Sequence, residues 1–566
     1  MKTPTHIIPI ALSSVPSLLR SHARAFLLAA VAILSLLVAA PQSMFADNAT
    51  WKATPGSSDW EIASNWSPAT VPNANDDGID ATATFATSSI TGVSTSNSNY
   101  TTVNGIVFNS GASAYTLTAS PPYYLYFDGV GITNNSGITQ KFVAAVDVFG
   151  SGGSIYFVNG ATAGNNTTFT LKGGSAYTYL YFNNYATAGS GSFILNGASP
   201  STGAGYGSIT FDNVATAENG TFTIEGSAAS GYSGSYIYFN GDSTAASGTF
   251  TIGGGTVSGA SGGYLQFNTY SAAGNSTLIA NGGLSGGSGG VIYFNYYADG
   301  ETARVEVFGN GTGDTTNGLL DISGLYGPGT SIGSLEGSGV VQLGINTLVV
   351  GSNNRSTTFS GVIQDYGYNS DGGDSLTKVG TGKLSLTKAS TYFADTTVKA
   401  GSLFVLNKTG SATGTGNVRV NAGTLGGTGK ITGTLTLGTG SGIGAFVSPG
   451  TSATKPGTLT VTNNTVTFNS DSTYKCALNR ATPKATQVAA KGVSINSGAQ
   501  FVFADAGAGT LTAGTVFTVI NNTTASSPIT GTFGNLANGA TFTSNGTTFK
   551  AAYAGGTGND LTLTVQ

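Results

Sequence analysis

Charged residues and cysteine are scarce in this sequence of 566 residues. Only 8% of the residues are charged, one is cysteine and two are histidine. The single cysteine, Cys476, cannot form a disulfide within the chain, so stability must come from backbone pairing and side-chain packing. Its place among polar neighbours in YKCAL predicts a buried apolar residue rather than a reactive thiol.

The amino terminus lacks acidic residues and carries one apolar run. Lys2, Arg20 and Arg24 precede the run AFLLAAVAILSLLVAA, and small residues follow it. This order predicts a secretory signal peptide over residues 1–46 with cleavage after Ala46. The alternative is a retained membrane anchor, but the run is shorter than the roughly 20 residues that a spanning helix needs. We therefore expect an exported protein, extracellular or at the cell surface, with the periplasm as an alternative.

Removal of this segment would leave the mature chain without histidine, because both histidines, His6 and His22, lie within it. The formal charge of −4 would become more negative by the three basic residues lost. An acidic surface argues against nucleic acid as a partner. Without histidine there is no Ser-His-Asp triad and no histidine-ligated metal. No later stretch is apolar enough for a transmembrane helix, so the mature chain is expected to have none.

A sequence motif of about 28 residues recurs through the first half of the chain. A phenylalanine anchor recurs at spacings of 30, 25, 29, 28, 28 and 27 residues. These anchors are Phe127, Phe157, Phe182, Phe211, Phe239, Phe267 and Phe294. From Phe157 onward a second apolar anchor follows after 11 or 12 residues: Phe169, Phe193, Phe222, Phe250, Leu278 and Val305. The alternating pattern, as in YIYFNGDSTAASGTFTIGGG, is typical of two short strands and a glycine-rich return.

Repeats of this length indicate a solenoid. One unit could not bury its apolar face alone, but stacked units form a continuous core, with each strand pairing to its equivalent about 4.8 Å away. The sequence therefore predicts an all-β, elongated parallel β-solenoid, or β-helix, with short amino- and carboxy-terminal caps. A propeller fits worse, because each blade would need about 40 residues and four strands.

Beyond about Gly333 the sequence pattern of the repeat changes. Residues 376–386 read LTKVGTGKLSL, followed by TTV at 396–398 and AGSL at 400–403. This stretch resembles the autotransporter-associated β-strand repeat of secreted, passenger-type bacterial β-helices. The resemblance implies a right-handed, passenger-like solenoid at the cell surface. A full autotransporter ends in a translocator barrel, but β-helix-like sequence continues to Gln566, so we expect no such barrel here.

These patterns predict five segments. They are a signal peptide (1–46), an amino-terminal cap with the first coils (47–118), a solenoid of ~28-residue Tyr/Phe/Gly-rich repeats (119–332), a strand-repeat solenoid (333–514), and carboxy-terminal strands that form a cap (515–566). The three tryptophans, Trp51, Trp60 and Trp66, close the open end of the solenoid or form a carbohydrate platform. Their position at the start of the mature chain favours the cap.

An outward line of tyrosines is the main candidate for binding. In the first strand of each unit the apolar residues point inward, so the residue between them points outward. The candidate stripe consists of Tyr126, Tyr156, Tyr181, Tyr238 and Tyr293, with Tyr124, Tyr179 and Tyr236 on the same face. Flat rings with hydroxyl edges suit sugar faces or another protein surface. The alternative is a purely structural tyrosine ladder.

Acidic residues offer weaker candidates. The densest cluster is Asp365, Asp371 and Asp374 in IQDYGYNSDGGDSL. Its oxygens could bind calcium, but the spacing is not that of an EF-hand, and a solvated loop is the simpler interpretation. Two carboxylates on adjacent coils could also stand at glycosidase distance, although the acids of the repeats are few and scattered.

The sequence as a whole predicts a secreted or cell-surface structural protein that is adhesive and not an enzyme. The expected partners are an extracellular polysaccharide or another cell-surface protein, and no cofactor is expected. Two alternatives stay open. One is a carbohydrate-active β-helix enzyme, a polysaccharide hydrolase or lyase, and the other is a polysaccharide-binding module that uses the tyrosine stripe.

Overall fold

The computed structural model describes residues 48–73, 81–96, 100–201, 203–310, 314–368, 373–442, 444–524 and 527–566. The predicted signal peptide and its cleavage point after Ala46 lie outside these residues. The described residues contain β-strands and two 3₁₀ helices, η1 (Ala63–Asn65) and η2 (Asp314–Thr316), but no α-helix. None of the helices found in this part of the chain is long and apolar enough to span a membrane.

Sheet A forms one side of the coils from the amino-terminal end to the middle of the chain. It has 14 strands, which pair in parallel with the equivalent strand of the next coil, except that β2 is antiparallel to β1. In spatial order they are β2 (Trp66–Ser67), β1 (Ala49–Trp51), β3 (Thr82–Phe85), β5 (Tyr100–Phe108), β7 (Tyr124–Asn134), β9 (Ser154–Phe157), β11 (Thr178–Phe182), β13 (Gly207–Phe211), β15 (Tyr236–Phe239), β17 (Tyr264–Phe267), β19 (Val291–Tyr296), β21 (Leu319–Leu325), β24 (Val340–Gln342) and β27 (Val362–Gln364).

Sheet B forms a second side and runs further toward the carboxyl end. Its parallel strands, in chain order, are β4 (Gly92–Ser94), β6 (Thr116–Ala119), β8 (Gln140–Ala144), β10 (Thr167–Leu171), β12 (Ser192–Leu195), β14 (Thr221–Ile224), β16 (Thr249–Ile252), β18 (Thr277–Ala280), β20 (Arg304–Val307), β23 (Ser334–Gly337), β26 (Thr357–Phe359), β29 (Lys383–Leu386), β31 (Ser402–Val405), β33 (Gly423–Gly427), β36 (Ala445–Pro449), β39 (Ser472–Asn479) and β43 (Gln500–Ala506). The short β40 (Lys484–Ala485) is antiparallel to β39.

The third side begins as single parallel bridges and continues as sheet C. The bridges join equivalent positions of successive coils: Gly131, Thr162, Thr187, Thr216, Thr244, Ala272 and Asp299. Sheet C consists of β22 (Gly329–Ile332), β25 (Thr347–Val350), β28 (Ser375–Lys378), β30 (Thr396–Val398), β32 (Val418–Val420), β35 (Leu435–Leu437), β38 (Val466–Phe468) and β42 (Val493–Ile495). Sheet C therefore starts beside the predicted boundary between the two repeat blocks.

Sheet D occupies the carboxyl end. Its strands, in spatial order, are β34 (Lys430–Ile431), β37 (Thr458–Val461), β41 (Gln487–Ala490), β44 (Val516–Asn522), β47 (Asp560–Val565), β46 (Thr547–Gly555) and β45 (Thr541–Ser544). The pairs from β44 to β45 are antiparallel. Parallel stacking therefore gives way to an antiparallel meander at this end.

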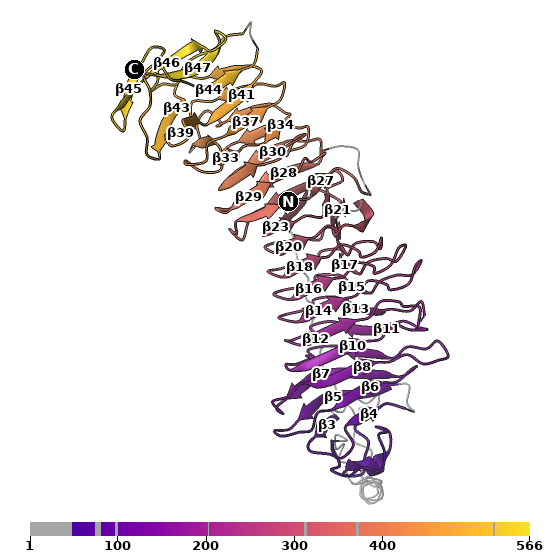
Figure 1. Cartoon of the computed structure of the whole chain (residues 1–566). Coiled ribbons are helices and arrows are strands. Elements are labelled where there is room, and N and C mark those ends of the chain that lie inside the picture. The colour runs from indigo at the N-terminus through magenta and orange to yellow at the C-terminus, as the bar shows by residue number, and fades with distance from the viewer. Residues whose placement is uncertain are drawn as a thin grey trace, which may run out of the picture. The chain divides into compact units, whose positions relative to one another are not determined.

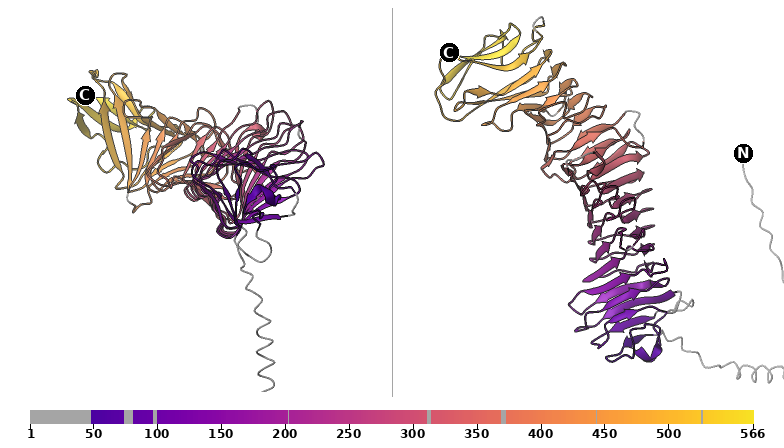
Figure 2. Two further views of the ribbon diagram at one scale, coloured as in Figure 1. Left: turned by 90° about the horizontal axis from the view of Figure 1, so that it is seen from below. Right: turned by 45° about the vertical axis from the view of Figure 1, so that its right-hand side comes forward.

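The strands follow one another along the stack in chain order (Figure 1), and the two further views in Figure 2 show the same succession of coils. From β9 to β19, equivalent sheet A strands of consecutive coils pair in register, whereas the register shifts once in the β5–β7 pair and once in the β19–β21 pair. The prediction of an all-β parallel β-solenoid is confirmed. Its right-handed sense stays a prediction.

The core is a pair of phenylalanine ladders. Every predicted anchor from Phe127 to Val305 is fully buried. The sheet A rings stack on those of the next coil with centroids 4.5–5.1 Å apart and planes within 11° of parallel. They meet the sheet B rings edge-on, as Phe211 meets Phe222 at 5.9 Å and 79°. Each such pair adds about 0.5–1.5 kcal/mol beyond the burial of its area.

Cys476 belongs to the same continuous core. Its side chain is fully buried, as predicted, and burial raises the pKa of its thiol to about 12. A thiol that stays protonated at neutral pH is a poor nucleophile.

Asparagine side chains mark the corner that follows sheet A. The Nδ2 atom of Asn268 donates to Oδ1 of Asn240 at 3.0 Å, and Nδ2 of Asn295 donates to Oδ1 of Asn268 at 3.3 Å. The next residue has a left-handed backbone, with φ of 54° at Thr269 and 58° at Tyr296. The amide ladder and the left-handed residue together end the strand and turn the chain.

The three tryptophans lie inside the amino-terminal end. Trp51, Trp60 and Trp66 are at most 1% exposed. Trp66 packs edge-on against Trp51 at 5.0 Å and against Trp60 at 4.8 Å, and all three contact Phe85. The alternative of an exposed carbohydrate platform is wrong, because the rings are enclosed by the first coils.

Candidate functional site

The five predicted stripe tyrosines stand in one column on the outer face of sheet A. Each precedes a buried phenylalanine in its strand and is partly exposed. The strand register defines the column as Tyr126, Tyr156, Tyr181, Thr210, Tyr238, Gln266 and Tyr293. The structure therefore brings the predicted residues together, and their role in binding stays a prediction.

Further tyrosines widen this column into a continuous surface, which we call the tyrosine face. Its members are Tyr100, Tyr124, Tyr126, Tyr156, Tyr177, Tyr179, Tyr181, Tyr206, Tyr236, Tyr238, Tyr264 and Tyr293. The ring centroids of Tyr156 and Tyr181 are 4.7 Å apart at 11°, and those of Tyr206 and Tyr236 are 4.8 Å apart. Sequence reasoning missed four of them.

The missed members are Tyr100, Tyr177, Tyr206 and Tyr264. Each lies an odd number of residues before an inward-pointing residue, as the predicted members do. The same alternation, followed further toward the amino end of each strand, would have found them.

Partial burial raises the pKa of several hydroxyls on the tyrosine face. Burial, reinforced by neighbouring tyrosines, raises the pKa of Tyr156, Tyr206 and Tyr238 to about 12. At neutral pH each hydroxyl can both donate and accept a hydrogen bond. The face therefore combines flat apolar rings with uncharged polar edges.

Charge is nearly absent from sheet A. Its strands contain no lysine or arginine, and their only carboxyl side chains are those of Asp128 and Asp321. Sheet B differs, since Arg304 pairs with Glu306 at 3.0 Å and with Glu336 at 2.6 Å. The tyrosine face offers little that a charged partner could recognise.

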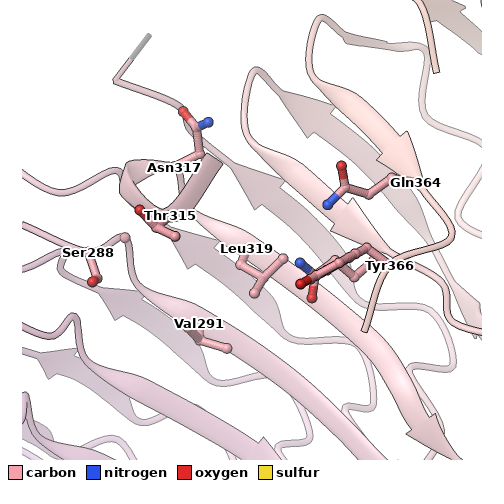
Figure 3. A pocket seen from close by; sticks show the side chains of 9 residues that line it. Ser288, Val291, Thr315, Asn317, Leu319, Gln364 and Tyr366 are labelled. Carbon is pink, nitrogen blue, oxygen red and sulfur yellow. The ribbon is translucent and has the colours of Figure 1, made fainter. Parts of the chain in front are cut away.

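A groove of about 510 Å³ lies where the tyrosine face ends toward the carboxyl side. Its lining consists of Ser288, Gly289, Val291, Thr315, Asn317, Leu319, Gln342, Gln364 and Tyr366. The stripe column continues past Tyr293 through Asp321 and Gln342 to Gln364. Figure 3 shows Val291 and Leu319 between Thr315 and Asn317 on one side and Gln364 and Tyr366 on the other. The sequence did not predict this groove.

Asp321 is the one carboxyl side chain in this part of the column. Its carboxylate accepts the backbone N–H of Ser323 at 2.9 Å, and burial raises its pKa. Glycosidases use two carboxyl groups on either side of the bond. The other acid on the strands of sheet A, Asp128, lies far along the sheet on β7.

The predicted acidic cluster is only partly described. Asp371 lies outside the described residues. Asp374 is fully buried, its carboxylate accepts the backbone N–H of Phe393 at 3.1 Å, and burial raises its pKa. The expectation of a solvated loop is therefore wrong for Asp374. Asp365 is partly exposed, and within the described ranges no group of three or more metal-binding side chains occurs. Calcium binding at this cluster stays a prediction.

A second line of tyrosines runs along the corner after sheet A. Tyr185, Tyr270, Tyr297 and Tyr326 are 73%, 64%, 54% and 60% exposed. The rings of Tyr270 and Tyr297 stack at 5.3 Å and 10°. These residues follow the strand ends, where the alternation of inward and outward positions stops, so the sequence pattern did not reveal them.

Part of the chain is similar to an autotransporter adhesin. Over 132 residues, 22% of this chain, it is 37% identical to the adhesin BmaC autotransporter of Brucella suis biovar 1 (strain 1330). The match covers 4% of the length of that protein. No protein-family profile matches the chain. The match and the parallel solenoid together fit a passenger-type protein, as the sequence predicted.

Proposed function

We propose that this chain is an exported, cell-surface adhesive solenoid that is not an enzyme and whose tyrosine face is the contact surface. The observation that carries this proposal is the continuous, partly exposed and nearly uncharged tyrosine face of sheet A. The similar protein is named an adhesin, which supports the same role here. Since each coil is held by its neighbours, the fold presents the face as one ordered surface.

The favoured partner is an extracellular polysaccharide, and the second is another cell-surface protein. The rings of Tyr156 and Tyr181 are nearly parallel and provide a flat apolar platform. Sugar rings carry apolar C–H faces that stack on such platforms, while their hydroxyls bond to tyrosine O–H groups.

Adhesion is tested with beads coated with the purified protein. The double variant Tyr181→Ser with Tyr238→Ser removes two rings of the central column. We expect retention on polysaccharide-coated surfaces and on cell monolayers to fall by about tenfold, because stacking area is lost. The measurement is the number of beads that remain after a defined shear wash.

Tyr185→Ser is the matched control. It lies four residues after Tyr181, is 73% exposed and does not belong to the tyrosine face. This variant should retain beads like the unchanged protein, and all variants should keep the same β-rich circular dichroism spectrum. Equal retention by the double variant and the unchanged protein would refute the tyrosine face as the contact surface.

The alternative of a carbohydrate-active enzyme rests on Asp321, whose carboxyl lies in the column beside the groove. Incubation with a panel of polysaccharides, followed by assay of new reducing ends, separates the two functions. We expect no reducing ends above background. Release that disappears in Asp321→Asn would establish the enzyme instead.

A further inference from the structure

The groove at the end of the tyrosine face has an apolar floor. Val291 of β19 and Leu319 of β21 are register partners on the outer face of sheet A. They continue the column of Tyr236 and Tyr264, so aromatic rings lead directly into the groove. Both floor residues are partly exposed, which leaves an apolar strip open to a ligand.

The walls of the groove are polar and uncharged. Thr315 and Asn317 stand on one side, and Gln364 and Tyr366 stand on the other (Figure 3). None of the lining side chains is ionisable except the phenol of Tyr366, whose ring is 69% exposed. A charged ligand would find no opposite charge in this lining.

Two glutamine amides at the groove have donor and acceptor capacity to spare. Gln342 and Gln364 are register partners, so their side chains leave the sheet about 4.8 Å apart. Within the described residues neither side-chain amide forms a hydrogen bond. Gln266, which lies nearer the amino-terminal end of the same column, instead donates to Oδ1 of Asn268 at 2.6 Å. The amides at the groove are therefore free to bond to a ligand.

We propose that this groove binds an uncharged oligosaccharide segment, with its sugar rings on Val291, Leu319 and Tyr366 and its hydroxyls bonded to Gln342 and Gln364. A pyranose has an apolar C–H face and a rim of hydroxyls, which matches the apolar floor and amide wall. The volume lies within the ~300–1,000 Å³ that is typical of small-molecule sites. The inference rests on the proposed function, because it makes the groove the site where a polysaccharide on the tyrosine face is selected.

Isothermal titration calorimetry on the full exported chain tests the groove. The probes are the neutral hexasaccharides of cellulose, amylose, laminarin and chitin, and the anionic hexamer of polygalacturonate. At least one neutral probe should bind, and the anionic probe should not. Gln342→Ala with Gln364→Ala should weaken binding about tenfold or more, since two amide bonds are lost. Tyr366→Ala should weaken it as well.

Gln500→Ala is the matched control, because this exposed glutamine lies on sheet B, far from the groove, and its amide donates to the carbonyl of Gly498 at 2.7 Å. It should bind like the unchanged protein, and all variants should keep the same thermal unfolding midpoint. The proposal that the groove binds a neutral oligosaccharide is refuted by any of three results. These are that no neutral probe binds, that the variant with Gln342→Ala and Gln364→Ala binds normally, or that the anionic probe binds equally well.

The two proposals fail in different ways. If binding is lost in the Tyr181→Ser and Tyr238→Ser variant but kept in the groove variants, the groove is not the oligosaccharide site. The proposal of adhesion through the tyrosine face is then still supported. Normal hexasaccharide binding at the groove without any bead retention supports the groove and overturns the adhesive function.

Discussion

At the scale of single residues, two aspartates show opposite effects of their surroundings. Burial raises the pKa of Asp321, which stands beside tyrosines of the tyrosine face. For Asp471 burial acts in the same direction, but backbone N–H groups outweigh it and lower the pKa. Its carboxylate accepts N–H bonds from Gly440 and Gly442 at 2.8 Å and from Thr439 at 3.0 Å. Ionised Asp321 therefore lowers the stability of the folded state, whereas ionised Asp471 raises it.

Asp321→Asn should raise the thermal unfolding midpoint at about pH 7. Because the folded pKa of Asp321 lies above its unfolded value of about 3.9, its contribution to stability is present in acid and is lost as the pH rises. The gain from the amide should therefore vanish near pH 3. The measurement is the unfolding midpoint of both proteins across this range.

Asp471→Asn is the comparison of opposite sign. A lowered folded pKa gives stability above the unfolded value, and this stability is lost as the pH falls. The Asp471 variant should therefore melt earlier at about pH 7, and the difference should shrink in acid. Shifts of equal size at both pH values would contradict the assigned environments.

At the scale of elements, the glycine-rich returns stack backbone on backbone. A Cβ on Gly234 would lie 2.3 Å from the carbonyl oxygen of Gly262, and one on Gly262 would lie 2.1 Å from that of Gly289. A Cβ on Gly289 would likewise lie 1.9 Å from the carbonyl oxygen of Asn317. Glycine is required here for the close approach of successive coils.

Gly262→Ala should therefore destabilise the solenoid, by about 1–3 kcal/mol, as is typical when atoms are forced into packed space. Gly160→Ala is the matched control, since a Cβ there has nothing within 4 Å. Denaturant midpoints of both variants provide the measurement. A Gly262 variant as stable as the Gly160 variant would show that the coils can move apart at no cost.

At the scale of the whole molecule, one core joins residues from Ala49 to Val565, and most strands of sheets A, B and C pair with the equivalent strand of the next coil. The ring of Phe222 stacks on Phe193 at 4.7 Å and on Phe250 at 4.5 Å. Stability in such arrays is a sum of local and nearest-neighbour contributions. Damage to one coil should therefore stay local.

Phe222→Ala should lower the free energy of unfolding of its own coil and the adjacent coils by about 3–5 kcal/mol. Hydrogen exchange should become faster in β12, β14 and β16 and stay unchanged in β32, β35 and β38. Thr223→Ala, which alters the adjacent outward-pointing side chain, should change neither region. Equal loss of protection along the whole chain would instead mean that the solenoid unfolds as one unit.

Several features of the candidate site depend on contacts that no local pattern reveals. The groove is assembled from residues as far apart as Ser288 and Tyr366, which only the stacking of coils brings together. Asp374 is buried, and its carboxylate accepts the backbone N–H of Phe393, which lies 19 residues later in the chain. The exposed corner tyrosines lie beyond the strand ends, where period-two alternation no longer indicates direction.

The sequence by itself determined the parallel solenoid, the buried phenylalanine ladders and the outward column of Tyr126, Tyr156, Tyr181, Tyr238 and Tyr293. It could do so because strand alternation turns spacing into direction, and a regular repeat places equivalent residues on one another. Only the tertiary structure decided how far the tyrosine face extends, where it ends and what groove lies there. Those features arise from loops of unequal length that fold across several coils, and their positions depend on long-range packing rather than on any local period.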